Sequence, residues 1–448
     1  MPRHTNPEHR FGLRTAILLV VATMIGTGVF TTTGFLLRDL GSQPAVLVAW
    51  LLGGLAAACG SLAYAELVAA LPHNGGEYRL LSRIYHPALG FIAGFVSLVV
   101  GFAAPVAASA MAFGEYLNLA LGSDWIPPLA SGLALVVGAS VLHSLHLSTG
   151  SRIQDFFTLG KALLILLFIL GGFFAIDASR LVGSGEPALL DAVLSPAFAV
   201  GLIYVSYAYS GWNAAAYVAG EVRDPGRLLP LALVVGTLTV MLLYLGVNTV
   251  FLGAAPAAEL AGAEERVGHV AAVHAFGELG GRILSGLIAL GLVSTVGALI
   301  LTGPRIYEAM GRDYRAMRLL ARRFDGGGPL IAVALQSLLA MLMMLTSSFD
   351  ALVSYVGFTL SVFAALTVAG VFVLRAREPD LPRPYRTWGH PFTSLGFIVL
   401  MGWMVYHAVQ QRPIVAAVGA ATIGLGWVAY RLVRRLERMD LETTASSD

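Results

Sequence analysis

Long apolar runs alternate with short polar segments along the whole chain. A helix needs about 20 apolar residues to cross the ~30 Å hydrocarbon core of a bilayer, and twelve runs have about that length. They predict membrane-spanning helices, numbered here in chain order as spans, at residues 13–40, 44–70, 88–121, 127–146, 152–175, 192–220, 230–254, 281–310, 328–347, 349–374, 391–409 and 413–431. The expected fold class is therefore an all-α polytopic membrane protein.

Two polar gaps, at residues 176–191 and 255–280, are longer than the others. The second is expected to hold short surface helices outside the bilayer, at Ala257–Arg266 and His269–Phe276. The runs leave no stretch for a separate soluble domain. The short, charged tail from Leu432 is expected to be partly disordered.

The composition excludes other fold classes. Of the 448 residues, 57% are hydrophobic and 12% are charged, about half the charged share of a soluble domain. A disordered chain needs low hydrophobicity, and a membrane β-barrel shows short alternating segments instead of continuous runs. The single cysteine, Cys59, cannot form an internal disulfide.

The basic residues predict an orientation. With the N-terminus in the cytoplasm, most of the 28 Lys and Arg residues fall on the inner side. This predicts an even number of spans and a multi-pass protein of the plasma (inner) membrane with both termini cytoplasmic. The group from Arg312 to Arg323 fits an inner loop, and the basic residues are too dispersed for a nucleic-acid-binding stripe. A signal peptide is disfavoured, because the first run is too long and no small-residue cleavage site follows it.

Two spans contain an interruption that a plain apolar helix would avoid. In span 1, Gly26 and Gly28 flank Thr27, and each glycine costs about 1 kcal/mol relative to alanine in a helix. Span 6 packs aromatic and hydroxyl side chains around Gly211, which lies nine residues, or ~13 Å, before Gly220 at the inner end. Unwound backbone at this depth is tolerated only where it lines a cavity. Close helix packing is the alternative explanation of the two glycines in span 1.

Together the interruptions predict a site for a zwitterion. A half-helix that begins at a break offers free N–H groups and a positive dipole end, which suit a carboxylate. A half-helix that ends there offers free carbonyl groups, which suit an ammonium group. Broken spans at corresponding positions of two halves point to the binding site of a secondary transporter. We therefore expect one five-span repeat at 13–175, a second, inverted repeat at 192–374 and two additional helices at 391–431.

Several motifs follow one another in a specific order. They are Ile25–Phe30; Tyr64–Leu67 with Pro72, Gly75, Gly76 and Tyr78; Lys161; Tyr207–Asn213 with Glu221, Pro225, Arg227 and Pro230; and Arg305. Together they resemble the amino acid–polyamine–organocation (APC) superfamily, which implies the LeuT-type fold for about the first ten spans. Gly220 departs from the paired acids that often follow span 6 in the family, and Ser210 stands where a smaller residue is common.

The resemblance implies a role for each residue at the interruptions. Amides around Gly26, Thr27 and Gly28 would hold the carboxylate of the substrate, so a Cβ atom at either glycine is expected to fill its space. Carbonyl groups would hold its amino group, and these belong to Met24, Ile25, Tyr207, Ala208 and Ser210. Tyr207 would also form the aromatic gate above the site, and Trp212 and Asn213 would begin the second half of span 6.

Lys161, the only lysine, lies near mid-bilayer, nine residues or ~13 Å from Arg152. A charge at this depth is a functional candidate, although a lysine can also snorkel to the interface. The resemblance implies that its ammonium group takes the place of the sodium ion that sodium-coupled relatives bind between spans 1 and 8. Its partners would then be carbonyls near Ile25 and the hydroxyls of Ser294 or Thr295.

The chain is therefore expected to be a sodium-independent secondary transporter of L-amino acids that works by alternating access. Exchange and proton-linked uptake both remain open. Neutral substrates are favoured because Phe91–Gly101, where family members for cationic amino acids often carry a Glu, contains no acid. A cationic amino acid or polyamine transporter of the same fold is the alternative. Glu66 in span 2 is interpreted as a structural partner of an inner arginine, with a proton carrier as the alternative.

Other function classes fit less well. An intramembrane enzyme would need a nucleophile–base pair or a metal set at membrane depth, and His143 and His146 have no third partner there. A channel usually needs a repeated filter, and no GxxxxGK[ST] motif for ATP is present. We expect no metal and no cofactor. The expected partners are an amino acid substrate and membrane lipids, without nucleic acid. No disulfide-linked subunit is expected, because Cys59 lies inside span 2. The oligomeric state is not predicted.

Overall fold

The computed structural model describes residues 12–73, 75–123, 125–145, 150–182, 188–323 and 329–445, and within these ranges every regular element is a helix. His146 lies outside the described residues. The first half contains α1 (Leu13–Met24), α2 (Gly28–Leu40), α3 (Gln43–Ala70), α4 (Gly76–Ile84), α5 (Pro87–Val96), the π-helical η2 (Ser97–Ala103), α6 (Ala104–Leu121), α7 (Pro128–Leu145), α8 (Gly150–Gly172), η3 (Phe173–Ala175), α9 (Ala178–Val182) and α10 (Leu189–Val193). The second half contains α11 (Pro196–Tyr209), α12 (Ala214–Tyr217), η4 (Ala219–Glu221), α13 (Pro225–Ala254), α14 (Ala257–Gly262), η5 (Glu264–Arg266), α15 (Val267–Thr302), α16 (Pro304–Asp313), η6 (Arg315–Ala321), α17 (Leu330–Thr346), α18 (Phe349–Arg377), α19 (Phe392–Gln411) and α20 (Pro413–Ala445).

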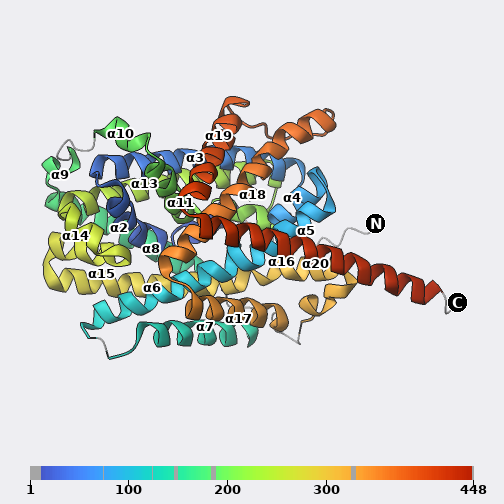
Figure 1. Ribbon diagram of the computed structural model, residues 1–448, viewed down its shortest axis with the longest axis horizontal. Helices are drawn as coiled ribbons and strands as arrows, with labels where there is room; N and C mark the ends of the chain where they lie inside the picture. The colour runs from blue at the N-terminus through green and yellow to red at the C-terminus, as the bar shows by residue number, and fades with distance from the viewer. Residues whose placement is uncertain are drawn as a thin grey trace.

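Within the described residues, eight helical segments are long and apolar enough to cross a membrane. They are Leu13–Leu40, Gln43–Ala70, Pro87–Leu121, Pro225–Ala254, Glu264–Asp313, Phe349–Arg377, Phe392–Gln411 and Pro413–Met439. Four shorter apolar helices accompany them: Pro128–Ser144, Leu159–Ala175, Pro196–Tyr209 and Leu330–Thr346. Most of the long helices lie along the long axis of the molecule (Figure 1). The chain is thus an all-helical polytopic membrane protein, as the apolar runs predict.

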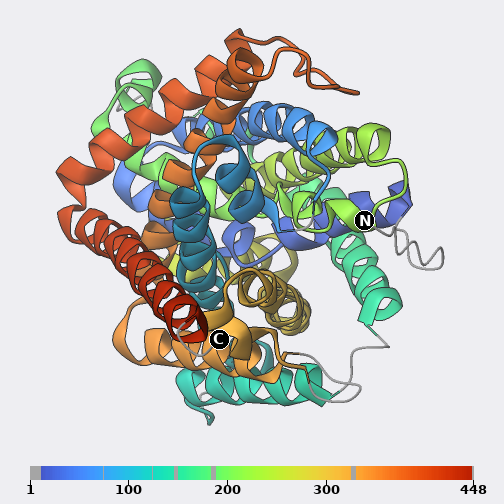
Figure 2. The same cartoon turned by 90° about the vertical axis from the view of Figure 1, so that its right-hand side faces the viewer.

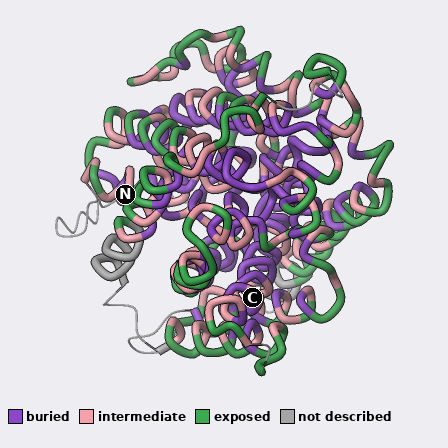
Figure 3. Tube along the Cα trace, turned by 90° about the vertical axis from the view of Figure 1, so that its left-hand side faces the viewer, coloured by how far each residue is buried: buried purple, intermediate pink, exposed green. Residues whose placement is uncertain are grey.

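The surface of the bundle carries large apolar side chains. Buried residues are concentrated in the middle of the molecule and exposed ones on the outside (Figure 3). On α8, Leu163, Leu167 and Leu170 are exposed, and so are Leu238 and Leu242 on α13. Monomeric soluble proteins rarely expose apolar patches of this kind, whereas contact with lipid removes their cost.

The centre of the fold is formed by two packed helix pairs. α13 lies against α3, and α15 lies against α6. The interrupted segments pack into this frame: α1 contacts α8, α12, α13 and α15, and α11 contacts α2, α3, α18 and α19. α19 and α20 lie along the outside of the bundle, on the side away from α8 (Figure 2).

Two elements differ from the expected boundaries. α15 begins at Val267 but is interrupted at Gly277, where φ is 75° and ψ is 179°. Only glycine adopts this left-handed region readily, so residues 267–276 form a separate helix at the place of the predicted surface helix. The expectation of a partly disordered tail from Leu432 is wrong as far as Ala445, because α20 continues to that residue. An i,i+3 pair supports this exposed turn, with Arg434 Nη1 3.2 Å from Glu437 Oε2.

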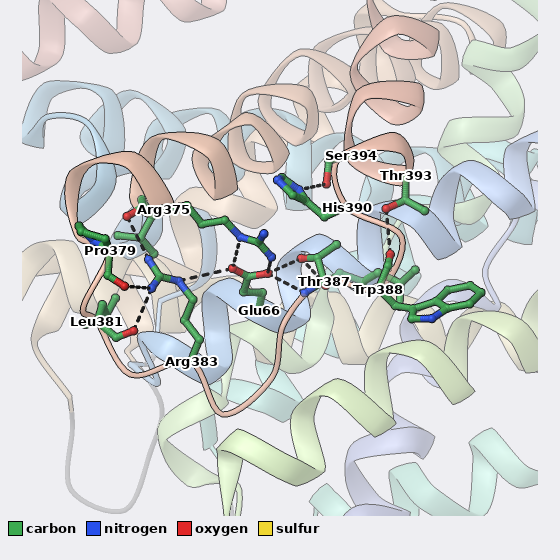
Figure 4. A network of polar contacts seen from close by, with 12 residues as sticks. Glu66, Arg375, Pro379, Leu381, Arg383, Thr387, Trp388, His390, Thr393 and Ser394 are labelled. Atoms are coloured by element: carbon green, nitrogen blue, oxygen red, sulfur yellow. Dashed lines mark hydrogen bonds and ion pairs between the residues drawn. The ribbon is translucent and has the colours of Figure 1, made fainter.

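Glu66 ties three segments together at the end of α3. Arg375 donates from Nε to Oε1 at 2.9 Å and from Nη2 to Oε2 at 2.7 Å. Thr387 donates its N–H and its hydroxyl to Oε2, at 2.6 and 2.7 Å, and Arg383 Nε lies 3.5 Å from Oε1. The network joins α3 to the end of α18 and to the segment before α19 (Figure 4). Glu66 is therefore a buried ion-pair partner, which agrees with the structural interpretation of this residue.

We expect Glu66→Gln to destabilise the protein strongly. Removing one partner of a buried ion pair leaves uncompensated charge and costs about 3 kcal/mol. Glu378→Gln is the matched control, because its pair with Arg83 is largely exposed and such pairs are worth ~0–1 kcal/mol. The melting temperature of the purified protein in detergent should fall clearly in the first variant and little in the second. Equal melting temperatures would contradict a structural role for the Glu66 network.

Candidate functional site

The first interruption separates α1 from α2. α1 ends at Met24, and Ile25 leaves helical geometry with φ −74° and ψ 87°. α2 begins at Gly28. Within the described residues, the amides of Thr27, Gly28 and Val29 make no backbone hydrogen bond, whereas the amide of Phe30 bonds to the carbonyl of Thr27 at 2.9 Å. The start of α2 therefore presents unpaired N–H groups, the arrangement that binds a carboxylate.

The second interruption separates α11 from α12. α11 ends at Tyr209, and α12 begins at Ala214. Gly211 between them has φ 96°, and a Cβ there would lie 2.8 Å from the carbonyl carbon and oxygen of Thr23. Glycine is thus required at this position by its conformation and by the close approach of α1. The hydroxyl of Thr23 donates to the carbonyl of Gly211 at 3.0 Å, so the two interruptions are in direct contact.

A cavity of about 150 Å³ lies between the interruptions. One water molecule needs roughly 10–15 Å³ of such space, so the cavity can hold a small solute. Most of the residues expected at the site line it: Met24, Gly26, Thr27, Gly28, Tyr207, Ala208, Ser210, Trp212, Asn213 and Thr295. The hydroxyls of Thr27 and Tyr207 are 2.6 Å apart and link the two halves at this point, where the gate is expected.

Tyr244 on α13 joins both interruptions and was not expected from the sequence. Its hydroxyl lies 2.5 Å from the carbonyl oxygen of Met24 and 3.2 Å from that of Ala208. These are two of the carbonyl groups expected to bind the amino group of the substrate. The side chain is fully buried, between α1 and α11. It therefore fixes the distance between the two half-helices that end at the cavity.

Lys161 on α8 reaches the first interruption from outside the cavity. Its Nζ donates to Thr295 Oγ1 at 3.1 Å and to the carbonyl of Ile25 at 3.4 Å. The side chain is buried, and its stem runs past Gly291, where a Cβ would lie 3.3 Å from Lys161 Cδ. The lysine therefore connects α8, α15 and the unwound end of α1.

Two expected residues lie elsewhere. Ser294 is not a partner of Lys161, because its buried hydroxyl makes no hydrogen bond within the described residues. Ser294 and Thr295 are about 100° apart on a helix, so only one of them can face α8. Ile25 lines a smaller apolar cavity beside Lys161 and is absent from the main one.

Glu77 is a cavity residue that the sequence analysis missed. It lies on α4, lines the cavity and is only 5% exposed. Its Oε1 accepts hydrogen bonds from the hydroxyl of Tyr64 at 2.5 Å and from Nδ2 of Asn213 at 3.1 Å. Burial raises the pKa of the Glu77 carboxyl above its usual range. The cavity thus contains an acid, although Phe91–Gly101 has none.

The sequence of residues 11–426 matches the family model described as amino acid permease. This chain belongs to the amino acid permease family. The resemblance to the APC superfamily is thereby confirmed, and so is the expectation of a transporter and not an enzyme. The two interrupted segments, the cavity and Lys161 all lie within the matched residues of the permease.

Individual relatives are similar over nearly the whole permease. The large neutral amino acids transporter small subunit 2 of Oryctolagus cuniculus is 29% identical over 95% of this chain and 80% of its own length. The serine/threonine exchanger SteT of Bacillus subtilis is 30% identical over 87% of this chain and 88% of its own. The b(0,+)-type amino acid transporter 1 of Homo sapiens is 28% identical over 86% and 80%.

Proposed function

We propose that the permease is a sodium-independent secondary transporter of L-amino acids that prefers neutral substrates and works by alternating access. The observation that carries this proposal is the pairing of two interrupted helices across one cavity. Unpaired amides at the start of α2 suit the carboxylate, and the carbonyl ends of α1 and α11 suit the ammonium group. The residues assigned to the substrate are Met24, Gly26, Thr27, Gly28, Tyr207, Ala208, Ser210, Trp212 and Asn213, with Ile25 at the edge of the site.

Twelve spans in two five-span repeats are part of the proposal. The eight long and four shorter apolar helices coincide with the twelve runs of the sequence. Helix contacts are reciprocal between the halves: α1 packs against α8 and α13, as α11 packs against α18 and α3. α8 packs against α13 and α15, as α18 packs against α3 and α6. This pattern supports equivalent repeats at 13–175 and 192–374, with α19 and α20 added outside.

The proposed orientation places both termini in the cytoplasm. α20 ends on the side of the molecule opposite α9, α10 and α14 (Figure 1). α4 and α16 lie on the side where α20 ends (Figure 1), and Arg79 of α4 pairs with Asp313 of α16, while Arg305 of α16 pairs with Glu221. Under the positive-inside rule this basic end faces the cytoplasm of a plasma (inner) membrane.

Substrate choice is the first test of the proposed function. In proteoliposomes, labelled serine or leucine should be taken up, and unlabelled alanine, serine, threonine and leucine should compete. Arginine and lysine should compete poorly, because a second charge in the cavity costs several kcal/mol unless it is paired. The printed names of the relatives, a large neutral amino acids transporter and a serine/threonine exchanger, support this choice. Competition by arginine and lysine without competition by neutral amino acids would overturn it.

The same experiment separates the modes of transport. Uptake is measured with and without internal amino acid, and with and without a pH gradient. Dependence on internal substrate indicates exchange, and accumulation driven by a pH gradient indicates proton-linked uptake.

A cationic amino acid or polyamine transporter is the second candidate, because Glu77 places a carboxyl in the cavity. A cationic side chain could pair with this group. The competition panel distinguishes the two candidates directly.

We also propose that the permease works without a disulfide-linked subunit. Its single cysteine, Cys59, lies in the middle of α3 and not in an outer loop. The rabbit relative is named a small subunit, so non-reducing electrophoresis of the native protein is the direct test.

A further inference from the structure

Among the described residues, three carboxylates are buried: Glu66, Glu77 and Glu308. Two of them are neutralised by guanidinium groups. Glu66 binds Arg375 with Arg383 nearby, and Glu308 binds Arg312 at 2.5 Å and Arg323 at 2.7 Å.

Glu77 differs from both, because no Arg, Lys or His of the described chain lies within 4 Å of its carboxyl. Its two partners, a phenol and an amide, are neutral. A buried carboxylate without a cation is costly, so this environment favours the protonated acid.

The surroundings of Glu77 contain few titratable groups. Tyr64 on α3 and Tyr217 on α12 face it. α5, the main neighbour of α4, carries none. At the end of α18, Arg375 is occupied by Glu66, and Arg377 donates to the carbonyl of Ile84 at 2.9 Å.

The two arginines on α4 itself are also engaged elsewhere. Arg79 pairs with Asp313, and Arg83 pairs with Glu378. Within the described residues, the group that charges or discharges at this end of the cavity is therefore Glu77.

Glu77 also contacts the second interruption. Asn213, which donates to its Oε1, is the last residue before α12 and belongs to the second interruption. The amide of Gly75 bonds to the carbonyl of Tyr217 at 3.2 Å, so α4 and α12 are joined by backbone as well. A change of charge on Glu77 would thus act on α12, which lines the cavity.

We propose that Glu77 is the proton-binding site of the permease and that its proton accompanies the amino acid. The buried surroundings, with Oε1 accepting from Tyr64 and Asn213, favour the protonated carboxyl. When water enters the cavity, the O–H bond breaks, the proton passes to water as hydronium, and the remaining carboxylate is solvated. The group is protonated below its raised pKa and loses the proton as the pH rises through it. This inference rests on the proposed function and assigns proton-linked uptake to it.

The transport test compares Glu77→Gln with the wild type in proteoliposomes. Glutamine keeps the acceptor oxygen for Tyr64 and Asn213 but cannot release a proton. We expect accumulation driven by a pH gradient to fall to the level of empty liposomes, while exchange of internal for external amino acid slows less than tenfold. Accumulation like that of the wild type in the variant, or no gradient-driven accumulation in the wild type, would overturn the proposal. Loss of arginine and lysine uptake alone would also overturn it, because the carboxyl would then bind a substrate side chain.

An infrared titration tests the proton without transport. The purified wild type should show the carbonyl stretch of a protonated carboxyl near neutral pH. The band should disappear in Glu77→Gln and remain in the ion-paired control Glu308→Gln. A band that persists in Glu77→Gln, or is absent from the wild type, refutes the assignment. If no amino acid is transported at all, the proposed function fails, and the infrared result still decides whether Glu77 holds a proton.

Discussion

A Gly28→Ala variant is expected to lose amino acid uptake at least tenfold, which corresponds to ~1.4 kcal/mol or more in the transport barrier. A Cβ at Gly28 would lie 2.4 Å from the Cα and 2.5 Å from the Cβ of Ala208 on α11. Both are far shorter than any real contact, and one of the atoms is backbone. The two half-helices must therefore separate, and overpacking of this kind costs about 3 kcal/mol.

Gly26→Ala is the matched control for this variant. A Cβ at Gly26 meets nothing closer than Thr295 Cγ2 at 3.7 Å, which is an ordinary contact. We expect this variant to keep the melting temperature of the wild type, so that any loss of its uptake reports on the carboxylate space and not on helix packing. The measurement is uptake per folded protein, together with the melting temperature in detergent. Wild-type uptake in Gly28→Ala would mean that the contact of α2 with α11 is not part of the working cycle.

The structure distinguishes the two glycines by their packing. The two glycines had equivalent roles in the interpretation of the sequence, since a side chain at either was expected to fill the carboxylate space. In the structure a Cβ at Gly28 would overlap Ala208 of α11, whereas a Cβ at Gly26 would make an ordinary contact with Thr295. Sequence spacing identified the interruption, but it could not tell which glycine supports helix packing, because that depends on the approach of a segment 180 residues away.

The interruptions themselves were predictable because they violate local rules. Glycines and hydroxyl residues inside an apolar run lower the stability of a helix. Their position in the run places them at a depth in the membrane where unwound backbone is tolerated only beside a cavity. Lys161 was predictable for the same reason, as a charge inside an apolar run. The sequence could not predict that Lys161 bonds to Thr295 and not to Ser294. That partner depends on the rotation of α15 about its axis, which a run of apolar residues does not determine.

Tyr244 and Glu77 show what the sequence does not reveal. Tyr244 is one tyrosine in an apolar helix, and only the packing of α13 on α1, beside Ala208 of α11, brings its hydroxyl to both carbonyl ends. Glu77 lies between motif residues Gly76 and Tyr78, in a segment expected to be a polar loop. Its burial arises because α4 folds back under the cavity against α5 and α12. The sequence feature that could have indicated Glu77 as a cavity residue is its place inside a glycine-rich motif next to an apolar span.

Replacing Lys161 is expected to have the other large effect. Its ammonium group bonds to the carbonyl of Ile25 and the hydroxyl of Thr295, and it joins α8 and α15 to the unwound end of α1. Hydrogen bonds to a charged group contribute about 1.5–3 kcal/mol each. We expect Lys161→Ala to fold and to turn over at least tenfold more slowly, because the end of α1 loses the positive charge that holds it.

The proposal that this lysine replaces a sodium ion predicts two further results. Wild-type uptake should be unchanged when sodium is replaced by choline, since the positive charge between α1 and α15 is part of the chain. Thr295→Val should slow transport, Thr295→Ser should restore it, and Ser294→Ala should have no effect, because only residue 295 contributes a hydroxyl to Lys161. The matched set separates the contact from general packing of α15. Sodium-driven accumulation by the wild type, or full activity of Lys161→Ala at every pH, would contradict the proposal. In either case the charge of Lys161 would not control the first interruption, and the buried lysine would have no role in transport.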